Sequence, residues 1–172
     1  MRTIETTASR IAALALVLLA TAGSAHAGAN RPFKASIDAE EHLGRSTECL
    51  GDQSQPGLRG TLQGTGHATH MGTLQVSAGH CMQQRTDGSF YASSGRMVLT
   101  SASGEVLHAD YAGFFLPAGG GTFTFEGNYF VTDGTGRFAG AGGTGALFGT
   151  VRGTFPSQIH GLSLSAEGRI SY

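Results

Sequence analysis

The sequence lacks tryptophan altogether and contains only two cysteines, four prolines and one lysine, Lys34, in 172 residues. Charged residues make up 13% of the chain, the net charge is −1 at pH 7, and the arginines are scattered singly. Proteins that bind nucleic acids or anionic lipids carry clusters of lysine and arginine that neutralise the phosphates. The absence of such a cluster argues against nucleic acid, or any other polyanion, as a partner.

Long hydrophobic runs are also scarce. The one such run, residues 11–22, follows Arg2 and Arg10 and precedes Ala25-His26-Ala27, which is the small-x-small pattern of a secretory cleavage site. The run is shorter than the roughly 20 residues that a membrane-spanning helix needs. We therefore expect a signal peptide over residues 1–27, an exported protein in the periplasm or outside the cell, and no membrane anchor.

Helical periodicity is absent from the rest of the chain, and its many glycines disfavour helix by about 1 kcal/mol at each interior position. Instead, every even-numbered residue from 58 to 76 is Leu, Gly, Ala, His or Val, while the odd-numbered ones are mainly polar. Only an extended chain with one buried face explains a period of two. The pattern predicts one long strand over residues 58–76.

Similar strands are predicted elsewhere, over residues 33–37, 97–100, 106–111, 122–131, 146–153 and 162–172. Strands that are polar on one face and joined by short loops without crossover helices indicate an antiparallel sheet that closes on itself. We predict an all-β fold, an eight-stranded antiparallel barrel that is closed or near-closed, with little helix. Residues 28–57 would form an N-terminal strand and an irregular segment, and residues 58–172 the remainder of the single domain.

Cys49 and Cys81 both lie in the exported part of the chain, where an even pair of cysteines most simply forms one disulfide. No Cys-x-x-Cys motif accompanies them, so a redox role is not favoured. We expect the bond to pin the irregular stretch of residues 48–55 onto the barrel wall.

Three segments carry a family resemblance. Residues 133–143, Asp-Gly-Thr-Gly-Arg-Phe-Ala-Gly-Ala-Gly-Gly, resemble the Gly-Gly-Thr-Gly-x-Phe-x-x-Ala-x-Gly signature of the allene oxide cyclase and dirigent protein barrels. Residues 103–105, Ser-Gly-Glu, resemble the Asn-Gly-Asp hairpin turn of exported bacterial relatives. Residues 66–72, Gly-His-Ala-Thr-His-Met-Gly, resemble their Gly-x-Ala-Thr-His-Leu-Gly strand. The resemblance spans residues 58–153.

The resemblance implies an eight-stranded barrel with an apolar interior pocket, and assembly into a homo-oligomer. It does not carry over an activity, because the chain has no counterpart of the cyclases' Tyr-Glu-Ile-Asn-Glu-Arg segment or of the dirigent proteins' Met-His-Asp-Ile strand. Independently of the family, Gly134 and Gly136 allow positive φ in a sharp reversal, and Phe138 would tuck under that turn as a plug.

Other motifs point to no cofactor or catalytic site. Residues 140–145 satisfy G-x-G-x-x-G, but the residues that follow read as a strand and not as the helix that a dinucleotide site requires. No Gly-x-Ser-x-Gly motif or Ser/His/Asp trio is present. The densest set of metal-ligand types is His67, His70, His80 and Cys81. Positions 67 and 70 should face opposite sides of a strand, and Cys81 is expected in the disulfide, so we expect no metal site. We also expect no cofactor.

His70 falls on the apolar parity between Ala68 and Gly72. An imidazole inside the barrel would be either a hydrogen-bonded core residue or a group that orients a ligand, with Tyr111, Tyr129 or Asp110 as companions.

The leading hypothesis is an exported, non-enzymatic barrel that binds a small apolar or aromatic molecule in its interior. The residues expected at the ligand are His70, Tyr111, Phe123, Phe125 and Tyr129. One alternative is a structural or interaction module with a filled barrel, since eight strands enclose only just enough space for their own side chains. Another is a cyclase or isomerase of allene oxide cyclase type, in which His70 acts as acid or base.

Overall fold

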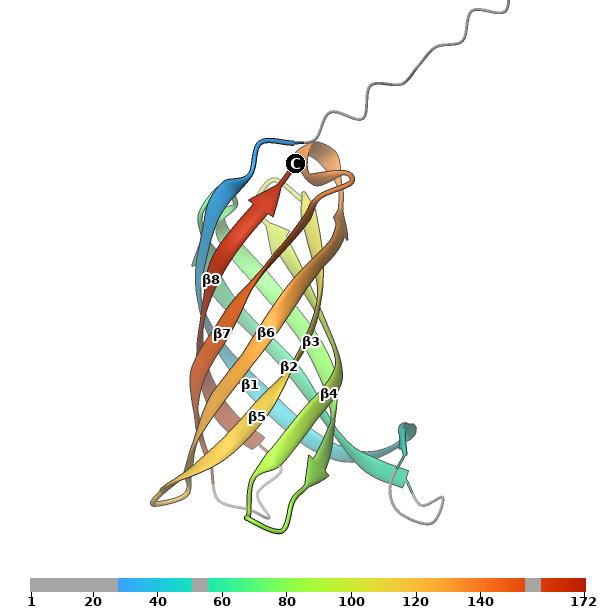
Figure 1. Cartoon of the computed structure of the whole chain (residues 1–172), viewed down its shortest axis with the longest axis vertical. Helices are drawn as coiled ribbons and strands as arrows, with labels where there is room; N and C mark the ends of the chain where they lie inside the picture. The colour runs from blue at the N-terminus through green and yellow to red at the C-terminus, as the bar shows by residue number, and fades with distance from the viewer. Residues whose placement is uncertain (1–27, 51–55, 154–158) are drawn as a thin grey trace, which may run out of the picture.

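The computed structural model describes residues 28–50, 56–153 and 159–172, and the signal peptide expected over residues 1–27 lies outside these ranges. Eight antiparallel strands form a closed barrel in chain order, and β1 pairs with β8 to complete the ring (Figure 1). The strands are β1 (Arg31–Leu50), β2 (Pro56–Ala68), β3 (Gly72–Gln84), β4 (Phe90–Ser101), β5 (Val106–Gly119), β6 (Thr122–Gly134), β7 (Gly142–Arg152) and β8 (Ile159–Ser171). Helix in the described ranges is limited to one 3-10 turn, η2 (Gly136–Phe138), and no helix there has the length and apolar character to cross a membrane. The predicted all-β, eight-stranded fold is confirmed.

The core of the protein is the inside of the barrel. Along β1 the side chains of Phe33, Ala35 and Ile37 are buried while the residues between them are exposed, and Leu162 and Ala166 continue this core on β8. The buried apolar residues form one continuous cluster. Burial of each large aliphatic or aromatic side chain stabilises the fold by roughly 1.5–3 kcal/mol relative to exposure.

The alternating stretch over residues 58–76 is two strands, and the prediction of a single strand is wrong. β2 ends at Ala68, residues 69–71 form a turn, and β3 begins at Gly72, which pairs with Ala68. Even-numbered residues pair with even-numbered residues along this hairpin, so the same parity faces the interior in both strands. The period of two therefore passes through the turn unbroken, and the pattern contains no sign of the reversal.

η2 lies at the upper end of the barrel in Figure 1, close to the C-terminus. Phe138 ends this turn and is completely buried, with its ring centroid 4.8 Å from that of Tyr172. Gly136 has a φ of +61°, a conformation that suits glycine. Gly134 has no such φ; a Cβ there would lie only 2.7 Å from the Cβ of Phe138. Gly134 therefore allows Phe138 to approach its backbone closely.

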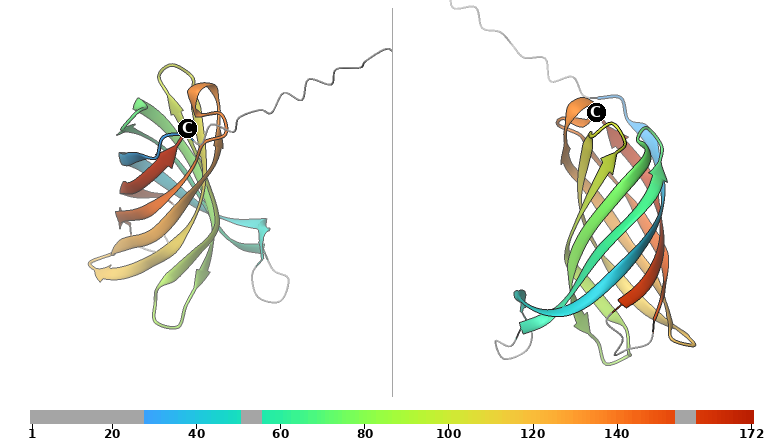
Figure 2. Two further views of the ribbon diagram at one scale, coloured as in Figure 1. Left: turned by 45° about the horizontal axis from the view of Figure 1, so that its top comes forward. Right: turned by 180° about the vertical axis from the view of Figure 1, so that it is seen from behind.

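The ends of β1 and β2 project from the lower end of the barrel as an arm, visible in both views of Figure 2. β1 pairs with β8 only as far as His42, whereas its pairing with β2 extends to Leu50. Residues 43–50 therefore have β2 as their single neighbouring strand. We define the arm as residues 43–50 and 56–59. The irregular stretch expected at residues 48–55 is wrong for residues 48–50, which belong to β1, although the register with β2 shifts between Ser46 and Leu50; residues 51–55 lie outside the described ranges.

The predicted disulfide between Cys49 and Cys81 is present, with 5.3 Å between the two Cα atoms. It joins β1 to β3, which are separated by β2 in the ring. The bond therefore holds the arm against the outer face of β3, as we expected for the barrel wall.

Candidate functional site

The residues expected at a ligand occupy several different environments. Tyr111 and Phe125 line a central cavity inside the barrel, and Phe123 lines a second, smaller cavity. Tyr129 is buried next to Phe33, with 6.0 Å between the ring centroids, but does not line either cavity. The structure thus brings Tyr111 and Phe125 together at one site.

His70 lies outside the barrel, and the expectation that it faces the interior is wrong. It sits in the turn of residues 69–71 with a φ of +68°, it is exposed, and its Nε2 lies 2.9 Å from the backbone oxygen of Pro32. His70 is even-numbered, like the inward-facing residues of β2 and β3, but it lies in the turn between these strands. Its parity therefore does not indicate where its side chain points. In this position, His70 cannot orient or protonate a molecule inside the barrel.

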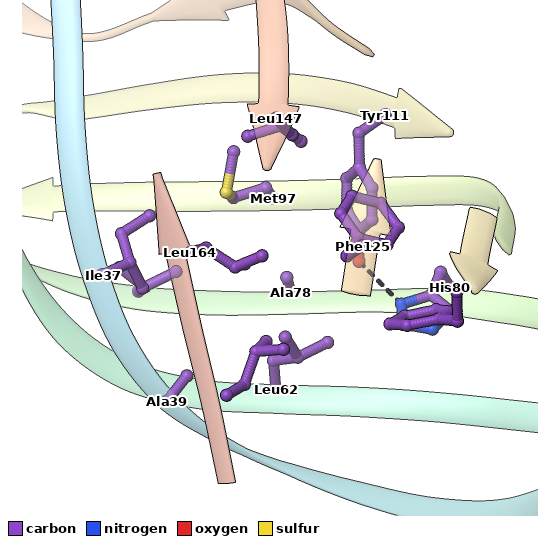
Figure 3. Close-up of a pocket in the computed structure, with 13 residues that line it drawn as sticks. Ile37, Ala39, Leu62, Ala78, His80, Met97, Tyr111, Phe125, Leu147 and Leu164 are labelled. Carbon is purple, nitrogen blue, oxygen red and sulfur yellow. Dashed lines mark hydrogen bonds between the residues drawn. The ribbon is translucent and has the colours of Figure 1, made fainter. Parts of the chain in front are cut away.

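The central cavity is enclosed by side chains from all eight strands, most of them apolar (Figure 3). Leu62, Met97 and Leu147 are typical of the lining, whereas His80 and Tyr111 are its polar members. The volume is about 20 Å³, and that of the second cavity is about 10 Å³. A cavity of this size has room for about one water molecule. In the described conformation, side chains fill almost the whole interior.

Four polar side chains meet at the edge of these cavities, and we call them the polar cluster: Glu41 on β1, His80 on β3, Tyr111 on β5 and His160 on β8. His80 Nε2 lies 3.1 Å from Glu41 Oε1, and His80 Nδ1 lies 2.8 Å from Tyr111 Oη, the contact dashed in Figure 3. His160 Nδ1 is 3.9 Å from the second oxygen of Glu41. Glu41, His80 and His160 are at most 2% exposed, so the cluster is withdrawn from solvent.

Strand register and one glycine assemble the cluster. Glu41 is directly opposite His160 across the β1–β8 pair. Gly60 of β2 lies between β1 and β3 and is paired with His80. A Cβ at Gly60 would collide with the Glu41 carboxylate and lie 2.9 Å from His80 Nε2. Glu41 and His80 can therefore meet at this point because Gly60 has no side chain.

The surroundings of Tyr111 keep its hydroxyl protonated. Burial, followed by the negative charge of Glu41, raises the pKa of Tyr111 far above its usual range. The protonated hydroxyl donates to His80 Nδ1 when that nitrogen carries no hydrogen, and His80 Nε2 then carries the hydrogen and faces Glu41. Carboxylate, imidazole and hydroxyl thus lie side by side next to the central cavity, an arrangement that orients the histidine.

Stability does not explain the polar cluster. Withdrawing a carboxylate from water costs several kcal/mol, and replacing buried ion pairs with apolar side chains of similar volume is often neutral or stabilising. Buried, interacting ionisable groups beside a cavity are instead typical of functional sites. Sequence reasoning missed Glu41 and His160 and considered His80 only as a metal ligand. A signal was present, because Glu41 continues the inward series of β1 and His160 lies two residues before the inward Leu162.

The four residues considered as metal ligands are not brought together. His67 is exposed on β2, His70 is in the turn, and Cys81 is in the disulfide, which leaves His80 alone in the interior. Over the ranges that the structure describes, no group of three His, Cys, Asp or Glu residues has an arrangement that could hold a metal ion.

Tyr129→Phe is expected to make the protein more resistant to alkali. Burial raises the pKa of Tyr129 to about 12. The unfolded chain loses this proton from about pH 10, so the stabilisation by the neutral buried hydroxyl is complete below about pH 10 and is lost as the pH rises to about 12. In urea denaturation across that range, wild-type protein should lose roughly 2–3 kcal/mol that the variant retains.

At neutral pH the same substitution should leave the free energy of unfolding unchanged or slightly higher, because Tyr129 Oη has no hydrogen-bond partner among the described residues. An equal alkaline loss in both proteins would contradict the assignment of the titration to Tyr129.

Comparison with known proteins gives no further guide to this site. No protein-family model matches the chain, and neither a curated protein nor a solved structure matches it.

Proposed function

We propose that this protein is an exported, non-enzymatic barrel that holds one small apolar or aromatic molecule, with a single hydrogen-bonding group, in its interior. The observation that carries the proposal is the position of the polar cluster at the edge of an otherwise apolar cavity. An apolar cavity with a few convergent polar groups is the usual form of a small-molecule site. The cluster would receive the polar group of the ligand, and the aliphatic lining would receive the rest.

The small size of the cavity sets a condition on binding. A molecule larger than water must displace lining side chains, and Met97 is the lining residue best suited to move. Met side chains in particular adapt to different shapes because they are unbranched and have three rotatable bonds. The bound and empty interiors would therefore differ in side-chain rotamers while the barrel wall stays in place.

Export belongs to the same proposal. A disulfide between Cys49 and Cys81 fits a non-reducing environment such as the periplasm or the cell exterior. The expected signal peptide over residues 1–27 supports the same location. An exported barrel that is cross-linked by a disulfide is suited to carry a compound outside the cytoplasm.

Tyr111→Phe is expected to reduce ligand occupancy about tenfold, because it removes from a cavity-lining residue the hydroxyl that would turn from His80 to the polar group of the ligand. Native mass spectrometry of protein from the exported fraction should show a one-to-one adduct that denaturation releases. Titration with 1-naphthol, an aromatic probe with one hydroxyl, should show the same difference between wild type and variant.

Tyr129→Phe is the matched control, because it removes a second buried hydroxyl that does not line the cavity. It should bind the probe as the wild type does. Equal loss in both variants, or an empty protein that ignores the probe, would refute an interior site at Tyr111.

The filled interior favours a second candidate, an interaction module that works through its outer surface. Phe114, Phe130 and Phe148 are 38%, 58% and 48% exposed on the neighbouring strands β5, β6 and β7. Phe114 and Phe148 lie on either side of Glu126 of β6, and exposed apolar side chains that gather on one face mark interaction surfaces. In that case the purified protein would be empty and would form a homo-oligomer, and the double variant Phe130→Ser, Phe148→Ser would be monomeric.

A further inference from the structure

A groove of about 480 Å³ lies on the outside of the barrel, between the arm and the outer face of β3 and β4. Figure 2 shows the arm that forms one of its sides. The residues that matter for its chemistry are Glu48, Arg59, Ser77, Gly79, Ser94 and Arg96. Its volume falls within the range of small-molecule sites, in contrast to the interior cavities. We call it the arm groove.

Two arginines stand on either side of a bare stretch of β3. Arg59 on β2 is paired with Cys81, and Arg96 on β4 is paired with Gly79, so the two arginines flank β3 from opposite sides. A Cβ at Gly79 would lie 3.1 Å from a guanidinium nitrogen of Arg59. Because Gly79 has no side chain, the guanidinium group of Arg59 can lie over the strand, and the floor of the arm groove is backbone.

The arm itself supplies a carboxylate to one of these arginines. Glu48 forms an ion pair and a hydrogen bond with Arg59. The side chain of Arg96, in contrast, makes no ion pair or hydrogen bond with any residue in the described part of the chain, although Asp110 lies directly opposite Arg96 on β5. One guanidinium group in the arm groove is therefore occupied by a carboxylate, and the other is open to one.

Backbone strain occurs at the same place. β4 has a bulge between Ala92 and Gly95, and Ser94 within it has a φ of +53°. A serine rarely adopts this conformation, and residues held in it cluster at functional sites. Bulges also re-aim side chains next to binding sites. Here the bulge immediately precedes Arg96 and places Ser94 on the wall of the arm groove.

We propose that the arm groove binds the carboxylate of a small organic acid, with Arg96 as its principal partner and Arg59 shared with Glu48. Guanidinium and carboxylate groups match in geometry and form charge-assisted hydrogen bonds. The half-buried Val98 and the Cys49–Cys81 disulfide border the groove and offer contacts for the organic part of the ligand. This site is separate from the barrel interior and does not depend on a ligand there.

Benzoate is the probe for this site, followed by chemical shifts of backbone amides in the full mature protein at low ionic strength. Arg96→Gln should weaken benzoate binding about tenfold, the loss of one charge-assisted interaction. Glu48→Gln should strengthen it several-fold, because Arg59 is then released to the ligand. The shifts in wild-type protein should centre on Ser77, Gly79 and Ser94.

Arg152→Gln is the control, since Arg152 is exposed on β7 away from the arm groove, and it should bind benzoate as the wild type does. Equal weakening of benzoate binding by Arg96→Gln and Arg152→Gln would show that the loss comes from the change in net charge alone, and it would overturn the proposal. A titration with inorganic phosphate distinguishes a site that is specific for carboxylates from one that binds any oxyanion. Tighter binding of phosphate than of benzoate would overturn the assignment to a carboxylate.

Discussion

Phe138→Ala is expected to lower the free energy of unfolding by about 3–5 kcal/mol, the usual cost of removing a fully buried aromatic ring. Phe138 is 0% exposed and contacts Tyr172 at the upper end of the barrel. The turn that holds Phe138 is closely packed at Gly134 and has a positive φ at Gly136. The backbone therefore has little freedom to move into the space that the ring leaves behind. Urea denaturation followed by circular dichroism measures the effect.

Phe130→Ala is the matched control, because it removes the same ring from a position on the outer wall that is 58% exposed. Its free energy of unfolding should stay within about 0.5 kcal/mol of the wild-type value, as is usual for surface substitutions. Similar losses in the two variants would show that Phe138 does not act as a plug.

His80→Ala is expected to cost about 3–5 kcal/mol as well, for an electrostatic reason. The substitution removes the nearest partner of the Glu41 carboxylate, which is 1% exposed, and the hydrogen-bond partner of the Tyr111 hydroxyl. Two buried polar groups then lose the contacts that compensate for their lost hydration. Thermal and urea denaturation at neutral pH provide the measurement.

A double-mutant cycle with Glu41→Ala isolates the pair. The double variant should lose less than the sum of the two single losses, because the second substitution removes a group that the first has already left unpaired. His67→Ala, an exposed histidine on β2, is the control and should be close to wild type. Additive losses in the cycle would mean that Glu41 and His80 are not coupled.

Much of the fold could be predicted because one physical constraint, burial of one face of each strand, leaves a direct trace in the sequence. The alternation of Phe33, Ala35 and Ile37 is such a trace, and it gave the strand and its buried side correctly. The same constraint hid the turn at residues 69–71, since Ala68 pairs with Gly72 and parity is preserved across the hairpin. At the β4 bulge, in contrast, parity is not preserved. The inward-facing residue before the bulge, Ala92, is even-numbered, and the one after it, Met97, is odd-numbered.

A local pattern indicates that Glu41 and His160 face inward, but it does not indicate that the members of the polar cluster meet. Glu41, His80 and His160 come from three strands, and their meeting depends on the register of β1 with both β2 and β8. A one-residue slip in either pair would turn a partner outward. Gly60 looks like any other strand glycine until the register places it between Glu41 and His80. His70 and His80 are both even-numbered, and only the position of the turn at residues 69–71 separates the exposed histidine from the buried one.

The pairing of β1 with β8 has a consequence for how the molecule is made. Residues 31–42 pair with residues 159–170, so β1 gains its second neighbouring strand only when β8 joins the sheet. Contacts so distant along the chain form slowly, and a sheet that awaits them has two edges of unpaired backbone amides and carbonyls. Until closure, the growing barrel is an open sheet that can pair with other chains. β8 is therefore the strand that protects the other seven from aggregation.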